Sequence, residues 1–439
     1  MNSGRMLVLL LVLVGASGSL VSGAAFYYHL LYLGVILTAV GWFSVRWVAR
    51  GLQLTRRPDF YRASVGDIFK EQFEILNSSR WPGSWVELHN EMRLPMAAGS
   101  RLLTRLRPRQ KQTFVARTWL TQRGGFAVGP TRLVVADPLG LFRVERSFPA
   151  QRKLVVLPLV FAVRDVLQPP GLLPGGQVIR RRSVDITPHA SGVRPYVPGD
   201  PMRRIHWPTT ARRGHLIVKE FEQDPQAEVW VFLDSHQKAH SQIAYQTPAM
   251  ALETLLFTRR PKLTLPPSTL EYGVSIAASL SQYFLEEQRS VGFVTRDRAY
   301  TMLPAERSQR QGTKILETLA FVEGRGDQSI AALVSAHAPL LPKGTSVLLI
   351  TPTTSEEVLL VTDDLQRRKL RPLVILLEAR SFGGVPGTDR IAAALKVQGV
   401  PTRIISCGVD LSDALSGFSA SAGAQDAFRW QRPALSHLI

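Results

Sequence analysis

The residues best equipped for chemistry lie in one short stretch, Arg194 to Phe221. It reads RPYVPGDPMRRIHWPTTARRGHLIVKEF and places two histidines, an aspartate and a glutamate among several arginines. A catalytic interpretation needs a general base, a carboxylate that orients it and a hydroxyl nucleophile. The candidates are His206, His215, Asp200, Glu220, Thr209, Thr210 and Ser191. Their spacing matches no nucleophile elbow, phosphate-binding loop or zinc site, so we assign no catalytic residue.

The same stretch carries signals for local folding. Asp200 followed by Pro201 is typical of a helix start, with the aspartate as cap and the proline at the first helical position. Pro208 disfavours helical backbone in the residue before it, so this helix is expected to end near Trp207. Gly214 permits a turn, and the HLIVKEF segment that follows is predicted to form a strand.

We interpret this stretch as a joint between two domains. The Trp207 side chain would fill the joint, and arginine guanidinium groups would form bidentate pairs with carboxylates around it. An exposed basic edge that docks an acidic partner is the alternative, and it would use Arg203, Arg212, Arg213 and Lys219. The residues assigned to the joint are Arg194, Tyr196, Pro198, Gly199, Asp200, Arg204, Trp207, Arg212, Gly214, Glu220 and Phe221.

The stretch coincides with a boundary in charge. Residues 1–220 hold 31 Lys and Arg against 12 Asp and Glu, whereas residues 221–439 hold 22 of each, so the first half carries the whole net charge of +19. The 439 residues are 45% hydrophobic, which suits two or three folded domains. The single cysteine, Cys407, excludes an intrachain disulfide and fits a reducing compartment.

The N-terminal region, residues 1–50, predicts a membrane anchor. Met6 to Ser44 spans 39 residues without Asp, Glu, Lys or Arg, and one spanning helix needs about 20 apolar residues. Small residues in Gly15–Ala24 permit a reversal. We therefore expect a helical hairpin, with helices at roughly Met6–Ser19 and Ala24–Val45.

Basic residues predict the orientation of this anchor. They flank the hairpin and are absent from its turn: Arg5, Arg46, Arg50, Arg56 and Arg57. Because such residues favour the cytoplasmic side, both ends of the hairpin are expected there. The alternative is a cleaved signal peptide followed by one anchor, which leaves the soluble part on the same side.

The soluble part divides by pattern. Residues 58–165 hold short apolar runs between Gly, Pro and Asn, which is typical of an antiparallel β-sandwich. Residues 166–226 are rich in Pro, Gly and Arg and form the linker and joint. In residues 227–420, near-continuous apolar runs such as AEVWVFLDS alternate with helical spacing, which predicts a doubly wound α/β domain. A tail, residues 421–439, follows.

Three segments in this order carry a family resemblance. They are DPLGLFR at Asp137–Arg143, the Arg194–Phe221 stretch, and the apolar strand that ends at Asp234. Together with the hairpin, they resemble the domain of unknown function 58 (DUF58) family of bacterial membrane proteins. The resemblance implies an immunoglobulin-like β domain, a C-terminal domain similar to a von Willebrand factor A domain, and an association with MoxR-type AAA+ ATPases. It implies no established catalytic activity.

The von Willebrand resemblance raises the question of a metal site. Such domains bind Mg²⁺ through Asp-x-Ser-x-Ser after the first strand, with a Thr and an Asp from later loops. Here Asp234-Ser235-His236-Gln237-Lys238 follows the strand, and the Thr351–Thr354 segment after SVLLIT holds no carboxylate. One anionic ligand is too few for Mg²⁺. We expect Asp234 and Ser235 to form a degenerate site without a metal or other cofactor.

The expected function is that of a membrane-anchored cytoplasmic scaffold. By the family resemblance, it works with a MoxR-type AAA+ ATPase in the assembly or maturation of envelope or membrane complexes. The basic half could also lie against anionic lipid. Nucleic acid is not expected, because aromatic platforms do not alternate with the basic residues. The alternatives are a metal-dependent ligand-binding domain and a hydrolase or transferase.

Overall fold

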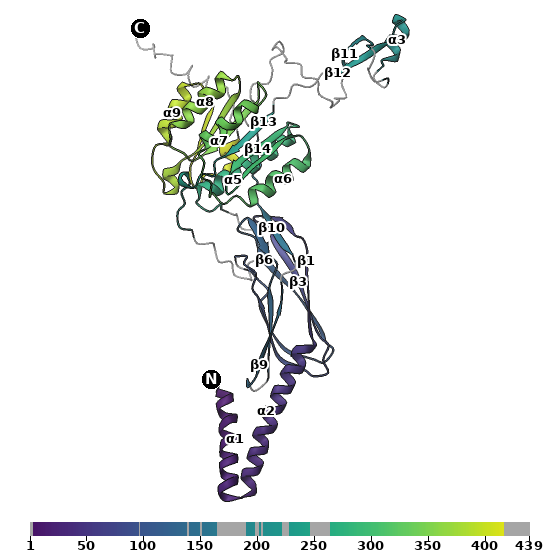
Figure 1. Cartoon of the computed structure of the whole chain (residues 1–439), viewed down its shortest axis with the longest axis vertical. Coiled ribbons are helices and arrows are strands. Elements are labelled where there is room, and N and C mark those ends of the chain that lie inside the picture. The colour runs from purple at the N-terminus through teal and green to yellow at the C-terminus, as the bar shows by residue number, and fades with distance from the viewer. Residues whose placement is uncertain are drawn as a thin grey trace, which may run out of the picture. The chain divides into compact units, whose positions relative to one another are not determined.

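The computed structural model describes most of the chain and shows two compact units. The first comprises residues 1–161, 241–279 and 312–324, and the second comprises residues 162–240, 280–311 and 325–439. Within them, the described residues are 3–95, 97–137, 140–149, 152–164, 190–197, 202, 205–221, 228–245 and 264–416. Figure 1 labels many of the elements.

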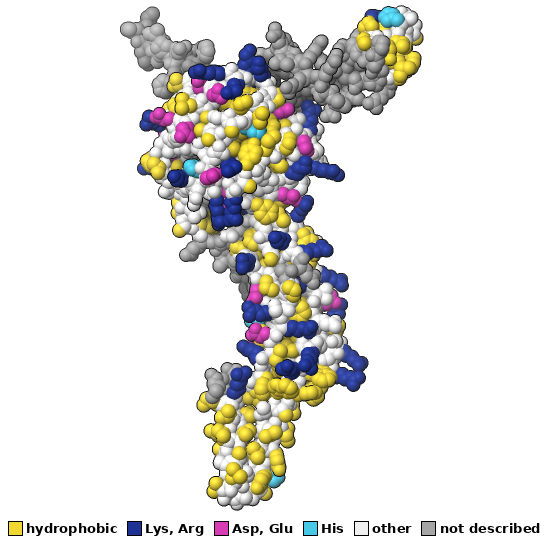
Figure 2. All heavy atoms as spheres, in the orientation of Figure 1, with side chains coloured by type: hydrophobic (Ala, Val, Ile, Leu, Met, Phe, Trp, Pro, Cys, Tyr) yellow, Lys and Arg dark blue, Asp and Glu magenta, His cyan; other side chains and the backbone are white. Residues whose placement is uncertain are grey.

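The N-terminal residues form the predicted pair of apolar helices, α1 (Ser3–Ser22) and α2 (Ala25–Gly51). Both are long and apolar enough to cross a membrane, and Figure 2 shows hydrophobic side chains covering them. Glycines let the helices approach closely, since a Cβ at Gly15 would clash with the Leu31 backbone and one at Gly18 with the Tyr27 ring. Gly23 turns the chain between them with a φ of +63°.

Helix α2 extends beyond its expected end at Val45. One face of its last turns is apolar, and Val45 and Val48 on it are buried in the core of the β-rich region that follows. The chain passes directly from α2 into β1, and the Arg146 guanidinium donates hydrogen bonds to the carbonyls of Ala49, Arg50 and Leu52 at 3.1, 3.1 and 2.7 Å. These bonds satisfy carbonyls that a helix C-terminus leaves unpaired, so α2 and the β-rich region form one continuous body.

The β-rich region confirms the short strands expected from the alternating pattern. One antiparallel sheet has the order β1-β3-β6 and another has the order β5-β4-β8-β9; a third, small sheet has the order β2-β10-β7. The two larger sheets share one core, to which Phe73, Leu88 and Leu133 contribute. The bounds are β1 Leu52–Pro58, β2 Arg62–Ser64, β3 Ile68–Asn77, β4 Gly83–Asn90, β5 Arg101–Leu106, β6 Lys111–Trp119, β7 Gly124–Ala127, β8 Thr131–Ala136, β9 Arg143–Phe148 and β10 Lys153–Leu157.

Part of the basic excess in this region is used internally. Arg56, counted above among the residues that orient the anchor, donates to Glu71 at 2.6 Å and to Thr131 at 2.7 Å. Lys111 forms an ion pair with Glu74. Burial raises the pKa of the Glu71 carboxyl, and the neighbouring Arg56 opposes that rise. Arg56 therefore stabilises the fold rather than facing lipid.

The C-terminal part contains one six-stranded sheet with the order β15-β14-β13-β16-β17-β18. All its pairs are parallel except β14 with β15, which is antiparallel. The strands are β13 Val229–Leu233, β14 Val291–Arg296, β15 Tyr300–Glu306, β16 Ser346–Thr351, β17 Arg371–Leu377 and β18 Thr402–Ile405. The alternation of strands and helices is as predicted, but the edge strand β15 was not anticipated.

Helices connect these strands. Trp230, Phe232 and Leu349 of the sheet form a core with residues of α7, α8 and α9, which therefore cover one face. Helix α7 was not anticipated from the sequence. The helices are α5 Thr269–Glu286, α6 Gln309–Ala320, α7 Ile330–His337, α8 Glu357–Arg367, α9 Thr388–Val397 and α10 Leu411–Leu415, with 3-10 turns η2 Gln237–Ala239, η3 Ala338–Leu340 and η4 Ala379–Phe382.

The stretch singled out in the sequence forms a small lobe. Strands β11 (Ala190–Pro195) and β12 (Ile217–Phe221) pair antiparallel, and α3 (Trp207–Arg213) lies between them in sequence. We call these three elements the motif lobe; it is labelled in Figure 1.

Candidate functional site: the motif lobe and the carboxyl end of β13

Helix α3 of the motif lobe begins later than the sequence suggested. Ile205 forms a β-bridge with Val218, so no helix runs from Pro201 to Trp207; α3 begins at Trp207 and places Pro208 in its first turn. That position tolerates proline, because the first helical N–H groups have no intrahelical acceptor. Asp200 and Pro201, expected to cap the helix, lie outside the described residues.

His206 takes the capping role. Its Nδ1 accepts a hydrogen bond from the Thr209 backbone N–H at 3.3 Å and lies 2.6 Å from Thr209 Oγ1. The structure thus brings together a histidine and a hydroxyl from the catalytic alternative. The other candidate histidine and threonine are also engaged locally: His215 Nδ1 contacts the Arg213 carbonyl oxygen at 2.9 Å, and Thr210 Oγ1 accepts from the Ile217 N–H at 3.1 Å.

These contacts hold the helix in place. Among the side chains that the structure describes, no carboxylate is hydrogen-bonded to His206; the side chains of Asp200 and Glu220, the two candidate orienting carboxylates, lie outside them. Gly214 ends α3 in the left-handed region, with a φ of +71°, and its N–H bonds the Thr210 carbonyl oxygen at 3.0 Å. The turn predicted at Gly214 is therefore confirmed, and the residue type is the one that this backbone favours.

Trp207, which was expected to fill a joint, is exposed within the part of the chain that the structure describes. Its side chain is 62% exposed, and α3 buries none of its residues. Arg212 and Arg213, in the last turn of α3, are exposed as well. The lobe is held instead by Ile205, Ile217 and Val218, which are buried, whereas Met202 is exposed.

The remaining joint residues are only partly described. Tyr196 is half-buried, and its N–H bonds the Leu216 carbonyl oxygen at 2.9 Å. Arg194 lies in β11, and Lys219, Glu220 and Phe221 lie in β12. The residues that fall outside the described part of the chain are Pro198, Gly199, Asp200, Arg203 and Arg204.

A second polar cluster lies at the carboxyl end of β13, next to the point where the strand order reverses between β14 and β16. This is the usual ligand position in open α/β sheets. Asp234 follows β13 and is only 2% exposed. Its Oδ2 accepts a hydrogen bond from Thr351 Oγ1 at 2.6 Å, and its Oδ1 accepts one from the His236 N–H at 2.9 Å.

Burial dominates the electrostatics of this carboxyl. Desolvation raises the pKa of Asp234 above its usual value, and the Thr351 hydrogen bond and the neighbouring His240 and His236 oppose the rise. No Lys or Arg forms an ion pair with Asp234 among the described residues. The charged form is therefore stabilised only by neutral donors and the two imidazoles.

Ser235 is engaged elsewhere. Its hydroxyl donates to the Arg296 carbonyl oxygen at 2.6 Å and lies 3.0 Å from Thr295 Oγ1, at the end of β14. The Gly326 N–H bonds the Ser235 carbonyl oxygen at 2.8 Å, and a Cβ on Gly326 would lie 2.1 Å from the Arg296 carbonyl oxygen. Backbone therefore passes too close here for any residue but glycine.

The side chains of this cluster are not a suitable set of ligands for Mg²⁺. The cluster offers one carboxylate, and its hydroxyls are already bonded within the protein. No group of three or more His, Cys, Asp or Glu that could hold a metal occurs in the described parts of the chain. Asp234 and Ser235 were predicted from the sequence, whereas Thr351, Thr295 and His240 were not. One sequence signal could have identified Thr351: it is the last residue of the apolar SVLLIT run, which forms β16 beside β13.

Residues 192–250 match the family model described as "Protein of unknown function DUF58". The matched segment includes the described part of the motif lobe from Gly192 onward, β13, and Asp234 and Ser235 of the second cluster; Thr295 and Thr351 lie outside it. The chain therefore resembles the DUF58 family, as its motifs predicted. No curated protein matches the chain.

Solved structures give only distant likenesses. The CARDB domain of a Pyrococcus furiosus protein, solved with di-metal ions, is 10% identical and covers 24% of this chain and 91% of its own, with a TM-score of 0.19. A Listeria innocua β-glucosidase is 10% identical over 22% of this chain and 16% of its own, with a TM-score of 0.14. A Vibrio harveyi β-N-acetylglucosaminidase is 8% identical over 79% and 59%, with a TM-score of 0.17. Scores this low assign neither fold nor function.

Proposed function

We propose that this protein is a membrane-anchored docking scaffold whose motif lobe binds a protein partner on the cytoplasmic side of the membrane. The DUF58 resemblance suggests a MoxR-type AAA+ ATPase as that partner, in the assembly or maturation of envelope or membrane complexes. The protein then acts by holding its partner at the membrane and not by making or breaking bonds.

The exposure of Trp207 carries this proposal. A tryptophan that is 62% exposed leaves a large apolar surface in water, although burial would be favourable. Tryptophan and arginine are the side chains most enriched where protein partners bind tightly. Arg212 and Arg213 follow Trp207 on α3, and their charge suits an acidic partner. The whole feature lies inside the family-matched segment.

The construction of the anchor supports the scaffold role. Helix α2 continues into β1, and Arg146 ties the junction to β9, so the hairpin can hold the β-rich region rigidly. Phe43 stacks on Trp47 with ring centroids 5.2 Å apart, and Trp81 from the β3–β4 turn meets Phe43 at 6.1 Å. Aromatic side chains concentrate at membrane–water interfaces, which would place this turn at the bilayer surface.

The orientation rests on charge. Arg46 and Arg50 lie in the last two turns of α2, Arg5 lies near the start of α1, and the turn at Gly23 holds no basic residue. Positive residues favour the cytoplasmic side, so both helix ends would lie there. The basic surface of the β-rich region in Figure 2 would then face an anionic leaflet.

The two soluble folds complete the proposal. Two antiparallel sheets around one core suit an immunoglobulin-like spacer. A parallel sheet with one antiparallel edge, and an aspartate after the first strand, suits a von Willebrand A-like domain. In this proposal Asp234 acts as a degenerate site that stabilises the fold, because its ligand atoms are engaged internally.

Photo-crosslinking in native membranes tests the proposal. A photoreactive phenylalanine analogue would replace Trp207 in the full chain, and a matched variant would carry it at Trp85, which is also an exposed tryptophan. Illumination is expected to link position 207, but not position 85, to the ATPase. Equal capture at both positions, or none at 207 with or without ATP, would contradict the proposal.

A further inference from the structure

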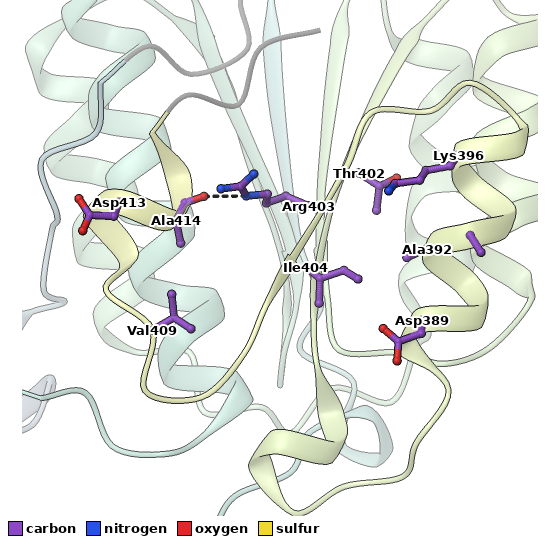
Figure 3. Close-up of a pocket in the computed structure, with 10 residues that line it drawn as sticks. Asp389, Ala392, Lys396, Thr402, Arg403, Ile404, Val409, Asp413 and Ala414 are labelled. Atoms are coloured by element: carbon purple, nitrogen blue, oxygen red, sulfur yellow. Dashed lines mark hydrogen bonds between the residues drawn. The ribbon is translucent and has the colours of Figure 1, made fainter. Parts of the chain in front are cut away.

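The C-terminal edge of the six-stranded sheet is open. Strand β18 is the last strand in the sheet order, and α9 and α10 flank it. The three elements enclose a groove of about 730 Å³, lined by Asp389, Lys396, Thr402, Ile404, Val409 and Asp413 among others. Figure 3 shows α9 on one side of β18 and α10 on the other.

The register shows which backbone groups face this groove. Strands β17 and β18 are parallel, with Ile375 opposite Arg403. The carbonyl oxygens of Pro401 and Ile405 accept hydrogen bonds from the β17 side, at 3.0 and 2.9 Å. Because alternate residues of a parallel strand bond to the same neighbour, the N–H and C=O groups of Thr402 and Ile404 face away from β17. They have no backbone partner among the described residues.

The side chains around this edge are both apolar and acidic. Ile404 and Val409 are 37% and 43% exposed, so apolar surface lines the groove. Asp389 lies on the α9 flank and Asp413 on the α10 flank, and neither forms an ion pair within the described residues. Arg403 Nε donates to the Ala414 carbonyl oxygen at 2.9 Å, which fixes α10 beside the strand.

A suitable occupant follows directly in the chain. Helix α10 is one wall of the groove, and residues 417–439 continue from its end. Their first part, GFSASAGAQ (417–425), consists mainly of small residues. The segment AFRWQR (427–432) then alternates in sequence between aromatic and polar residues, so that an extended chain would place Phe428 and Trp430 on one face and Arg429 on the other, and Pro433 follows it. Alternation with aromatic residues and a proline boundary is typical of a strand.

We propose that residues 427–432 of the same chain bind in this groove as a seventh strand, paired with the free edge of β18. The outward groups of Thr402 and Ile404 would receive the hydrogen bonds that they lack, as in other cases of strand addition. Arg429 and Arg432 fall on opposite faces of such a strand, so each flank would receive one arginine, and each flank holds one aspartate. The aromatic pair would cover exposed apolar surface.

The length of the connection is adequate. A flexible linker of nine residues, 417–425, has a root-mean-square span of about 16 Å, from roughly 5–6 Å times the square root of its length. The groove begins at α10 itself, so the segment does not have to travel far. Covering the edge in this way also protects the sheet from pairing with other chains.

Hydrogen exchange tests the proposal in the full chain held in detergent or a nanodisc. The Thr402 and Ile404 amides are expected to exchange at least tenfold more slowly in the full chain than in a chain that ends at Ser416. The double variant Phe428→Ser, Trp430→Ser should lose this protection, whereas Phe418→Ser, in the linker, should keep it. The Val374 amide, which bonds Pro401 within the sheet, should be unchanged in all and reports that the sheet is intact.

Two results would overturn the proposal. Equal exchange at Thr402 and Ile404 with and without residues 417–439 would show that the segment does not bind there. Protection that appears only as protein concentration rises would show that the occupant comes from a second copy. Neither result depends on the ATPase, so this proposal and the proposed docking function can fail separately.

Discussion

The motif lobe and the Asp234 cluster are both dense in polar residues, yet they are built in opposite ways. In the lobe, Trp207, Arg212 and Arg213 are exposed, and the described polar contacts cap α3 and join it to β12. In the cluster, Asp234 and Ser235 are buried, and every described contact is made within the protein. Residue type alone makes both look like sites, whereas burial separates a surface that can meet a partner from one that stabilises a fold.

This contrast predicts that substitutions in the two regions affect different measured properties. Changes at Asp234 should alter stability and leave partner binding intact. Changes at the lobe should alter binding and leave stability intact. A substitution at Asp234 that weakens partner binding without affecting stability, or one in the lobe that lowers stability without affecting binding, would contradict this contrast.

The largest effect is expected for Asp234→Ala. The substitution leaves the Thr351 hydroxyl and the His236 N–H without their acceptor in a buried place. Each such group costs about 1–3 kcal/mol, so a loss of about 2–4 kcal/mol in the free energy of unfolding is expected. Thermal and urea unfolding of the full chain in detergent measure it. Unchanged stability with lost ATPase binding would place docking at Asp234.

The next effect concerns His337, a buried histidine of the α/β sheet region. Its Nδ1 lies 3.0 Å from the Tyr300 hydroxyl, and its ring packs against Trp230 and Phe232. Burial lowers the pKa of His337 below its ordinary 6.5. The unfolded chain therefore binds this proton more readily, so stability is full above pH 6.5 and is lost as the pH falls below it, at about 1.4 kcal/mol per pKa unit.

Melting temperatures between pH 8 and pH 5 measure this dependence. His337→Phe keeps a ring among the aromatic neighbours and removes the titration, so its curve should be flatter below pH 6.5. A wild-type curve parallel to that of His337→Phe would show that this histidine does not control the acid response.

A smaller effect is expected at the basic end of α3. The double variant Arg212→Glu, Arg213→Glu should slow association with the ATPase several-fold, because these charges steer an acidic partner, and the difference should shrink with added salt. Stopped-flow or biosensor association rates measure it. The matched control is Arg367→Glu on α8, an exposed arginine outside the lobe, which should leave the rate unchanged.

The smallest effect is expected for Asp234→Asn. Because burial raises the pKa of Asp234, ionising this group costs stability as the pH rises through that pKa, and asparagine avoids the cost. Asparagine also loses part of the hydrogen bonding that the carboxylate makes. The free energy of unfolding at pH 8 should therefore change by no more than about 1 kcal/mol. A large loss at pH 8 would mean that the negative charge itself holds the loop.

Much of the fold could be predicted because periodicity reports burial directly. The uncharged run before Ser44 gave two helices, and the apolar runs gave the parallel strands. Strand β15 was missed because it lies at an edge with alternating exposure, where a short run has little apolar signal. The start of α3 was missed because Pro208 is usually a helix breaker, and only the structure shows it in the first turn.

The sites were harder to predict than the elements. Asp234 was recognised from its place after a strand, but its partner Thr351 is 117 residues away and is brought near only by the pairing of β13 with β16. The exposure of Trp207 could not be predicted, because an aromatic residue beside arginines occurs both in buried joints and on docking surfaces. Sequence supplies the residue types, and packing decides which of them meet solvent.

The affinity of the ATPase for the full chain in nanodiscs tests the central claim most directly, with wild type, Trp207→Ala and Asp234→Asn compared under one nucleotide condition. For Trp207→Ala we predict a dissociation constant at least tenfold larger, which is a loss of about 1.4 kcal/mol in binding free energy. For Asp234→Asn we predict an unchanged dissociation constant. The reverse pattern, or equal affinity for all three, would contradict the assignment of docking to the motif lobe.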